Sequence, residues 1–313
     1  MSFTTDVKHE ICQDRLDDGQ ARAQLAGLLL VKASLHMNST GMYLSFEIEN
    51  ATVAKHVWML LKRLYQVQPS LAVIRKMKLK KNNVYRIEVG ASAADILADL
   101  QILDERGLHL RPGYDLIRSE KNARAFIQGC FLASGSVNSP KTSNYHLEMS
   151  AAHEELARSI VRTLERLSIP ARITQRKNMN VVYIKAGDKV ADLLRLVNAS
   201  NMLMAFEDQR ISRDFYNQMR RLDNCELANE MKSMKAAENQ LEAIDIIEKK
   251  FAKARIPQTV QETMALRRKF PEASITELCD EIYKETGKII SKSGMKHRLR
   301  KLVQLAEEAG NEN

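Results

Sequence analysis

The sequence predicts an α+β protein in two parts: a pseudo-two-fold domain built from two αββαββα repeats, and an all-α domain of three helices. Three observations support this prediction. Residues 21–35 align without gaps to residues 123–137, and Ala, Arg, Ala, Gly, Leu and Ser recur at matching positions. The same succession of helical and alternating apolar patterns follows each segment. After Met204 the strand patterns end and only helical patterns remain.

Each repeat is predicted to contain three helices and two pairs of strands. In the first repeat, about 20–103, we expect a helix near 21–32, two strands around a turn at 38–41, a helix at 52–66, strands at 71–77 and 84–89, and a helix at 93–100. In the second, about 121–200, the turn is expected at 138–144, the next helix at 154–167, the strands at 171–176 and 181–186, and the last helix at 189–197. Asn82-Asn83 and Asn178-Met179-Asn180 supply the residues of the later turns.

Gly27 and Gly129 fall in the middle of the first helix of each repeat, where glycine costs roughly 1 kcal/mol relative to alanine. That cost favours a compensating close contact between the two helices through Ala23, Gly27, Ala125 and Gly129. The alternative is that each helix is buried separately in the core of its own repeat.

A polar helical segment and a second domain follow the repeats. Residues 207–256 favour helix, and their Asn217, Asn224 and Asn229 either bond across a domain contact or lie on an ordinary surface. We therefore expect domains at 1–206 and 257–313, joined by a linker at 207–256.

The last domain is predicted to contain three helices. The first spans about 258–270, the second follows a capping box at Ser274-Ile-Thr-Glu277, and the third begins near Ser291 or Ser293. Thr286-Gly287-Lys288 forms the turn before the third helix. The apolar stripe of that helix consists of Met295, Leu299, Leu302, Val303 and Ala306. This order is typical of a trihelical helix-turn-helix.

The composition is that of a folded, basic protein. Lys and Arg total 48 against 39 Asp and Glu, a formal net charge of +9, and 44% of the residues are hydrophobic. The longest apolar run, 25–31, is far shorter than the roughly 18 residues of a membrane span. No secretory signal pattern opens the chain, so we expect a cytoplasmic protein with no membrane partner. Cys12, Cys130, Cys225 and Cys279 form no Cys-x-x-Cys pair and are predicted to be free thiols.

Two motifs resemble those of known families. Leu25-Ala-Gly-Leu-Leu29 resembles the opening of the LAGLIDADG motif, and the doubled αββαββα order resembles the single-chain homing endonucleases that carry it. With its helix-turn-helix, the chain resembles the WhiA family of bacterial sporulation and cell-division regulators, most specifically at 124–137, 213–229 and 291–301. The resemblance implies a degenerate LAGLIDADG-like domain and a role in cell division, chromosome segregation or sporulation control.

The residues that hold metal in the endonucleases are replaced in this sequence. Each endonuclease core helix ends in an acid that holds a divalent cation. The matching positions are Lys32 and Ser134, and residues 21–46 and 121–147 contain no Asp or Glu. A lysine repels a cation, so we expect no metal, no cofactor and no enzymatic activity. An active nuclease is the alternative that these positions oppose.

Basic side chains on the later hairpin of each repeat are candidates for contacts to the DNA backbone. The endonucleases use the equivalent strands as a saddle on DNA, although a run of charges is usually a solvated face. The candidates are Arg75, Lys76, Lys78, Lys80, Lys81 and Arg86 in the first repeat and Arg172, Arg176 and Lys177 in the second.

The third helix of the helix-turn-helix presents a cationic face. Between Gly287 and Leu302 the sequence has six Lys or Arg and no acid, which suits contacts to phosphates and guanines. The residues expected at bases are Ser293, Lys296, His297 and Arg300, those expected at phosphates are Lys288, Lys292 and Lys301, and Ser291 and Arg298 complete the set. The alternative is a solvated basic helix in a protein-interaction module.

These features favour a sequence-specific regulator that binds double-stranded DNA in the nucleoid, with other regulators or division proteins as further partners. The alternative is a nucleoid-associated structural or interaction protein that binds DNA largely without sequence preference.

Overall fold

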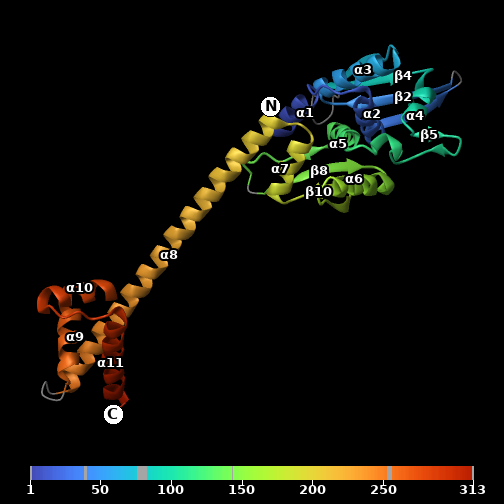
Figure 1. The fold of residues 1–313 in the computed structure, drawn as a ribbon. Helices are drawn as coiled ribbons and strands as arrows, with labels where there is room; N and C mark the ends of the chain where they lie inside the picture. Colours follow the sequence, from blue (N-terminus) through green and yellow to red (C-terminus); the bar gives the residue numbers. More distant parts are fainter. Residues whose placement is uncertain (1, 39–40, 76–82, 143, 252–255, 312–313) are drawn as a thin grey trace. The chain divides into compact units, whose positions relative to one another are not determined.

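The structure is a computed structural model that describes residues 2–38, 41–75, 83–142, 144–251 and 256–311 (Figure 1). The chain divides into two units, Met1–Arg213 and Asp214–Asn313. Within the described ranges, no helix is long and apolar enough to cross a membrane.

The first unit contains the αββαββα order twice, as the sequence predicts. A short helix, α1 (Phe3–Ile11), precedes the repeats. The first repeat consists of α2 (Asp18–Lys32), β1 (Ala33–Asn38), β2 (Gly41–Ile48), α3 (Ala51–Tyr65), β3 (Ser70–Arg75), β4 (Asn83–Val89) and α4 (Ala93–Asp99). The connection holds β5 (Leu103–Asp104), β6 (Gly107–Leu108) and the 3-10 turn η1 (Asp115–Ile117). The second repeat consists of α5 (Glu120–Ser134), β7 (Ser136–Val137), β8 (Leu147–Ala151), α6 (Glu154–Arg166), β9 (Arg172–Arg176), β10 (Met179–Ile184) and α7 (Gly187–Leu196).

The hairpin between β9 and β10 is tighter than predicted. Arg176 pairs with Met179, so the turn is Lys177-Asn178 and not 178–180. Both turn residues have positive φ, 47° and 60°, as a two-residue type I′ turn requires. In the first repeat, residue 82 of the predicted turn lies outside the described residues.

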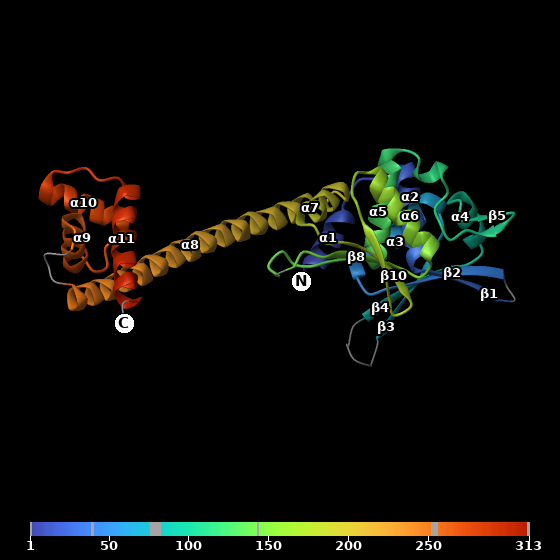
Figure 2. The same ribbon diagram turned by 90° about the horizontal axis from the view of Figure 1, so that it is seen from below.

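Each repeat forms a four-stranded antiparallel sheet, with the order β1-β2-β4-β3 in the first and β7-β8-β10-β9 in the second. Figure 2 shows helices α2, α3, α5 and α6 on one side of these strands. Along β2, Leu44, Phe46 and Ile48 are buried toward the helices, and Ser45 and Glu47 alternate with them. The other side of the strands is therefore open and polar.

The two core helices, α2 and α5, pack together at their glycines. A Cβ atom on Gly129 would lie 2.0 Å from the carbonyl oxygen of Gln24, and one on Gly27 would lie 2.4 Å from that of Phe126. Since no side chain fits at these distances, the glycines are what allow the backbones to approach. This confirms the predicted contact and excludes the separately buried helices.

A chain of buried hydrogen bonds crosses the same helix pair. Gln24 Nε2 donates to Gln128 Oε1 at 3.0 Å, and Gln128 Nε2 donates to Asp14 Oδ2 at 3.0 Å and to the Val197 carbonyl at 3.1 Å. His56 Nε2 lies 2.6 Å from Gln24 Oε1, which is an acceptor, so this nitrogen carries the proton. Buried amides require such partners, and the network therefore ties α2 to α5 in one register.

Helix α8 (Ser200–Lys250) begins against α1. The carboxylate of Glu10 accepts hydrogen bonds from the backbone N–H groups of Asn201 and Met202, at 2.7 and 3.1 Å. These donors have no partner within a helix, so Glu10 acts as a cap supplied from another helix.

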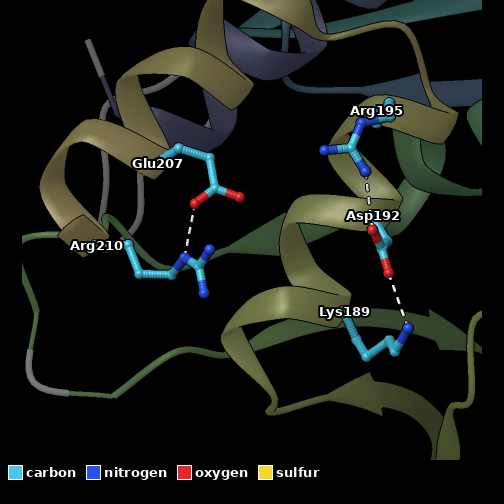
Figure 3. A network of polar contacts seen from close by, with 5 residues as sticks. All are labelled: Lys189, Asp192, Arg195, Glu207 and Arg210. Carbon is cyan, nitrogen blue, oxygen red and sulfur yellow. Dashed lines mark hydrogen bonds and ion pairs between the residues drawn. The ribbon is translucent and has the colours of Figure 1, made fainter. Parts of the chain in front are cut away.

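Three ion pairs lie on the surface of α7 and of the first turns of α8. Figure 3 shows Lys189 and Arg195 both paired with Asp192 along α7, and Arg210 paired with Glu207 along α8. The N–O distances are 2.9, 2.9 and 2.6 Å. Pairs this close to solvent contribute little to stability, so the start of α8 depends mainly on Phe206, which is fully buried, and on the Glu10 cap.

The second unit contains the three predicted helices, α9 (Gln258–Lys269), α10 (Ile275–Thr286) and α11 (Lys292–Asn311). One apolar cluster joins Leu266, Leu278, Ile282, Met295 and Leu299. A second joins Val260, Met264, Leu302 and Ala306 to Ala243, Ile244 and Ile247 of α8.

This second cluster changes the expected linker. Residues 207–256 are predicted to form a helical linker, and within this segment Ala243, Ile244 and Ile247 contribute buried side chains to the core of the C-terminal unit. The compact C-terminal unit spans Asp214–Asn313 and so includes part of α8 together with the predicted domain at 257–313. The sequence predicts that this segment is helical. It does not show which residues its apolar side chains pack against.

Candidate nucleic-acid interface

The start of α11 is fixed by local hydrogen bonds. Ser274 and Glu277 form a reciprocal capping box at the start of α10, as predicted. Gly287 ends α10 with a φ of 70°, a left-handed conformation that suits glycine. Ser291 Oγ then accepts the backbone N–H of Gly294 at 3.1 Å, so Ser291 caps α11. The turn and the first turn of α11 are thereby held in place.

The side of α11 opposite its core carries two parallel rows of polar side chains. The rows follow the i, i+4 spacing of a helix: Lys292, Lys296 and Arg300 in one, and Ser293, His297 and Lys301 in the other. All six are exposed, as is Lys288 in the preceding turn. The rows extend over about 14 Å at 1.5 Å per residue, close to the width of a DNA major groove.

Three of the predicted contact residues have other partners in the structure. Ser291 caps the helix, and Ser293 Oγ lies 3.0 Å from its hydroxyl. Arg298 is half-buried and lies beside Glu262 of α9, with Nη1 3.8 Å from the carboxylate. The face that remains for a ligand is therefore mostly lysine, with Arg300 its one exposed arginine among residues 288–301.

Arg267 is a structurally important residue that the sequence patterns did not indicate. It is 2% exposed, and its Nε donates to Gln240 Oε1 at 3.0 Å. Its Nη1 donates to the carbonyl of Ala273 at 2.6 Å, in the loop before α10. Burial lowers the pKa of its guanidinium. The sequence feature that could have indicated its burial is an arginine at an otherwise apolar position of α9.

The open side of the first sheet carries acids as well as bases. A hollow of about 320 Å³ is lined by Lys32, Arg86, Glu47 and Glu88, among others. Arg86 pairs with Glu47 at 2.6 Å across β4 and β2. Residues 21–46 contain no acid, but Glu47 of β2 and Glu88 of β4 bring two carboxylates to the hollow beside Lys32.

The second sheet repeats this arrangement more weakly. Arg176 lies 3.6 Å from the Glu148 carboxylate. Arg172 and Lys177 are exposed, with Lys177 in the turn. Arg75, at the end of β3, is exposed as well. The other hairpin candidates, Lys76, Lys78, Lys80 and Lys81, lie outside the described residues.

The two core helices end at Lys32 and Ser134, and neither residue is a carboxylate. Ser134 Oγ donates to the Ser150 carbonyl at 2.7 Å and accepts the Ser150 N–H at 3.0 Å. Lys32 is exposed beside the hollow, and burial together with the charge of Lys32 lowers the pKa of Lys8 to about 8. Over the described residues, no group of three His, Cys, Asp or Glu side chains could hold a metal ion.

Comparisons with family models cover most of the chain. Residues 18–103 match the WhiA N-terminal LAGLIDADG-like domain, residues 123–216 the WhiA LAGLIDADG-like domain, and residues 219–306 the WhiA C-terminal HTH domain. The chain belongs to the WhiA family. The family assignment agrees with the pseudo-two-fold α+β fold and the C-terminal helices described above.

Individual relatives match over nearly their whole length. The probable cell division protein WhiA of Latilactobacillus sakei is 40% identical over 98% of this chain and 97% of its own. That of Enterococcus faecalis is 39% identical over 98% of both. The crystal structure of full-length DUF199/WhiA from Thermatoga maritima shares the fold, with a TM-score of 0.59, 19% identity, and coverage of 98% of this chain and 99% of the other.

Proposed function

We propose that this chain is a sequence-specific regulator that binds double-stranded DNA, acts in bacterial cell division and has no nuclease activity. A part in chromosome segregation or sporulation control, and a cytoplasmic, nucleoid-associated location, belong to the same proposal. The names of its relatives support the cell-division role, since both are called probable cell division proteins.

The observation that supports DNA binding is the pair of exposed polar rows on α11. Ser291 caps the first turn of this helix and fixes its start. Five cations, Lys288, Lys292, Lys296, Arg300 and Lys301, lie exposed within 14 residues. Lysines are point charges suited to phosphates, whereas the guanidinium of Arg300 matches the O6 and N7 acceptors of guanine. Arg300 is therefore the first of the proposed base readers, which also include Ser293, Lys296 and His297 in the same rows.

The proposal of no nuclease activity rests on the core-helix ends. Cleavage of a phosphodiester needs cations that neutralise charge and activate water. Lys32 and Ser134 replace the acids of the endonucleases, and the hydroxyl of Ser134 is occupied by two backbone hydrogen bonds. The amino groups of Lys8 and Lys32 oppose cation binding further.

Paired titrations test the proposal. A preferred duplex is selected from random sequences, and its affinity is compared with that of a scrambled duplex at one salt concentration. Arg300→Ala is expected to cost about 1–3 kcal/mol on the preferred duplex and little on the scrambled one. The control is Arg221→Ala, which removes the same charge from an exposed position of α8. Equal losses on both duplexes with Arg300→Ala would reject base reading by this residue.

A second candidate, a nucleoid-associated protein with little sequence preference, is favoured by one specific observation. Ser291 and Arg298 have intramolecular partners, which leaves a face dominated by lysine. Mapping of the chromosomal sites that the chain occupies separates the two candidates. A regulator should concentrate at promoters, whereas a structural protein should spread along the chromosome.

A further inference from the structure

A cleft of about 680 Å³ lies in the first unit, between the connection that joins the two repeats and helix α6. Its volume is within the range of small-molecule sites. The charged residues that line it are Asp104, Arg106, Arg111, Arg162 and Arg166. Four arginines against one carboxylate make the cleft strongly cationic.

Some of the arginines that line the cleft are already paired within the protein, and others are not paired with any residue in the described ranges. Asp104 is engaged by His109, with Oδ2 2.8 Å from Nε2. Arg166 donates to the Ile117 carbonyl, and Arg111 lies 3.3 Å from an exposed carboxylate of Glu155. By contrast, the guanidinium groups of Arg106 and Arg162 have no hydrogen bond or ion pair with any residue that the structure describes.

The walls of the cleft are held by close packing. Gln101 takes a φ of 55° and lies against Gly113, where an added Cβ would be 1.9 Å from Gln101 Oε1 and 2.6 Å from its Cβ. The N–H of His109 donates to the carbonyl of Ile102 at 2.7 Å. The connection therefore forms a folded wall opposite α6, and the arginines on both sides are presented to the same space.

An aromatic ring stands at the same cleft. Tyr114 is 70% exposed and lines the space together with Leu103 and Ile117. Bidentate arginine is the preferred protein partner of phosphate, and an exposed aromatic face is a stacking surface for a planar base. We propose that this cleft binds a nucleotide with two or more phosphate groups, which contact Arg106 and Arg162 while the base stacks on Tyr114.

A long nucleic acid is a poorer fit than a small nucleotide. The cleft is lined by α4, the β5–β6 connection and α6. Helices α2, α3, α5 and α6 cover the side of the sheets opposite their open strand face (Figure 2). A duplex lying on the open strands therefore does not reach this cleft. The residues that line the cleft all lie between Ala98 and Arg166, so variants of the cleft and variants of α11 can be tested separately.

The experiment is calorimetric titration of the full chain with ATP, ADP and pyrophosphate at physiological salt. Saturable binding at one site is expected, and Arg106→Ala with Arg162→Ala should weaken it at least about tenfold, since each charged hydrogen bond is strong. The matched control is Arg158→Ala with Arg195→Ala, which removes two exposed arginines of the same unit that do not line the cleft. It should leave affinity within about twofold.

Two further variants locate the ligand. Tyr114→Ala should weaken ATP and ADP but not pyrophosphate, because only the nucleotides carry a base. Lys296→Ala with Arg300→Ala should leave all three affinities unchanged. The proposal is overturned if none of the probes binds more tightly than about 1 mM. It is also overturned if the control pair loses as much affinity as the cleft pair, or if the α11 variant abolishes nucleotide binding.

Discussion

His56 shows how one partly buried side chain makes stability depend on pH. Burial lowers the pKa of His56 to about 4, from 6.5. Between these values the unfolded state binds the proton and the folded state does not, so stability falls as the pH falls from 6.5 to 4. The shift corresponds to about 3 kcal/mol.

The first prediction follows from this shift. Replacement of His56 by Asn removes the titrating group while keeping an N–H donor for Gln24. The difference in unfolding free energy between the natural chain and His56→Asn should change by up to about 3 kcal/mol from pH 6.5 to 4, to the disadvantage of histidine. Denaturant unfolding followed by the fluorescence of Trp58, the one tryptophan of the chain, measures it. A difference independent of pH would contradict the partly buried, neutral His56.

A second prediction concerns Lys32 and Ser134. The purified chain should leave supercoiled and linear DNA intact in the presence of magnesium or manganese, because Lys32 repels a cation and the Ser134 hydroxyl is engaged by two backbone hydrogen bonds. Gel assays over several hours check this result. Contaminating nuclease is excluded by repeating the assay with variants of single carboxylates, beginning with Glu47 and Glu88. Cleavage that stops with one such variant would place an active site at that carboxylate and contradict the prediction.

The close packing of helix α2 against helix α5 depends on glycine. The third prediction is that Gly129→Ala lowers the unfolding free energy of the first unit by about 3 kcal/mol, because its Cβ would overlap the Gln24 carbonyl. Gly90→Ala is the matched control, since a Cβ there meets no atom within 4 Å. Urea unfolding followed by Trp58 measures both. Equal stability of the two variants would show that the helices are farther apart than described.

The buried Arg267 joins elements in the second unit. It bonds α8 through Gln240 and the loop before α10 through Ala273. The carbonyl acceptors lack a full negative charge, so the guanidinium is held by hydrogen bonds and not by an ion pair. Removal of this side chain would leave buried acceptors unsatisfied in the loop that positions the capping box of α10.

Electrostatic attraction is expected to dominate the affinity of the whole chain for DNA. The fourth prediction is that the logarithm of the binding constant falls with the logarithm of salt concentration with a slope near −5, for about six phosphate contacts. Replacing Lys292 by Ala should reduce the magnitude of the slope by about 1 on every duplex. Titrations at four or more salt concentrations test both values. A flat response would contradict the cationic face of α11 as the binding surface.

Much of the architecture could be predicted from local patterns. The repeat of Ala21–Leu35 at Ala123–Val137, the capping box at Ser274 and the glycine at 287 are short-range signals, and the structure agrees with each. These features can be predicted from the sequence because helix caps, turns and strand alternation depend on neighbours within a few residues. The fold class and the surface rows of α11 therefore followed from the sequence alone.

Only the tertiary structure decided which side chains meet across the sequence. Arg86 meets Glu47 and Arg298 meets Glu262 because strand pairing and helix packing bring distant residues within 4 Å. The same holds for Ile244 and Ile247, which turn part of an expected linker into core. The arginine cleft unites Arg106, in the connection between the repeats, with Arg162 of α6 in the second repeat. Charge counts along a chain do not report such neighbours, since electrostatic and packing energies depend on distance in space.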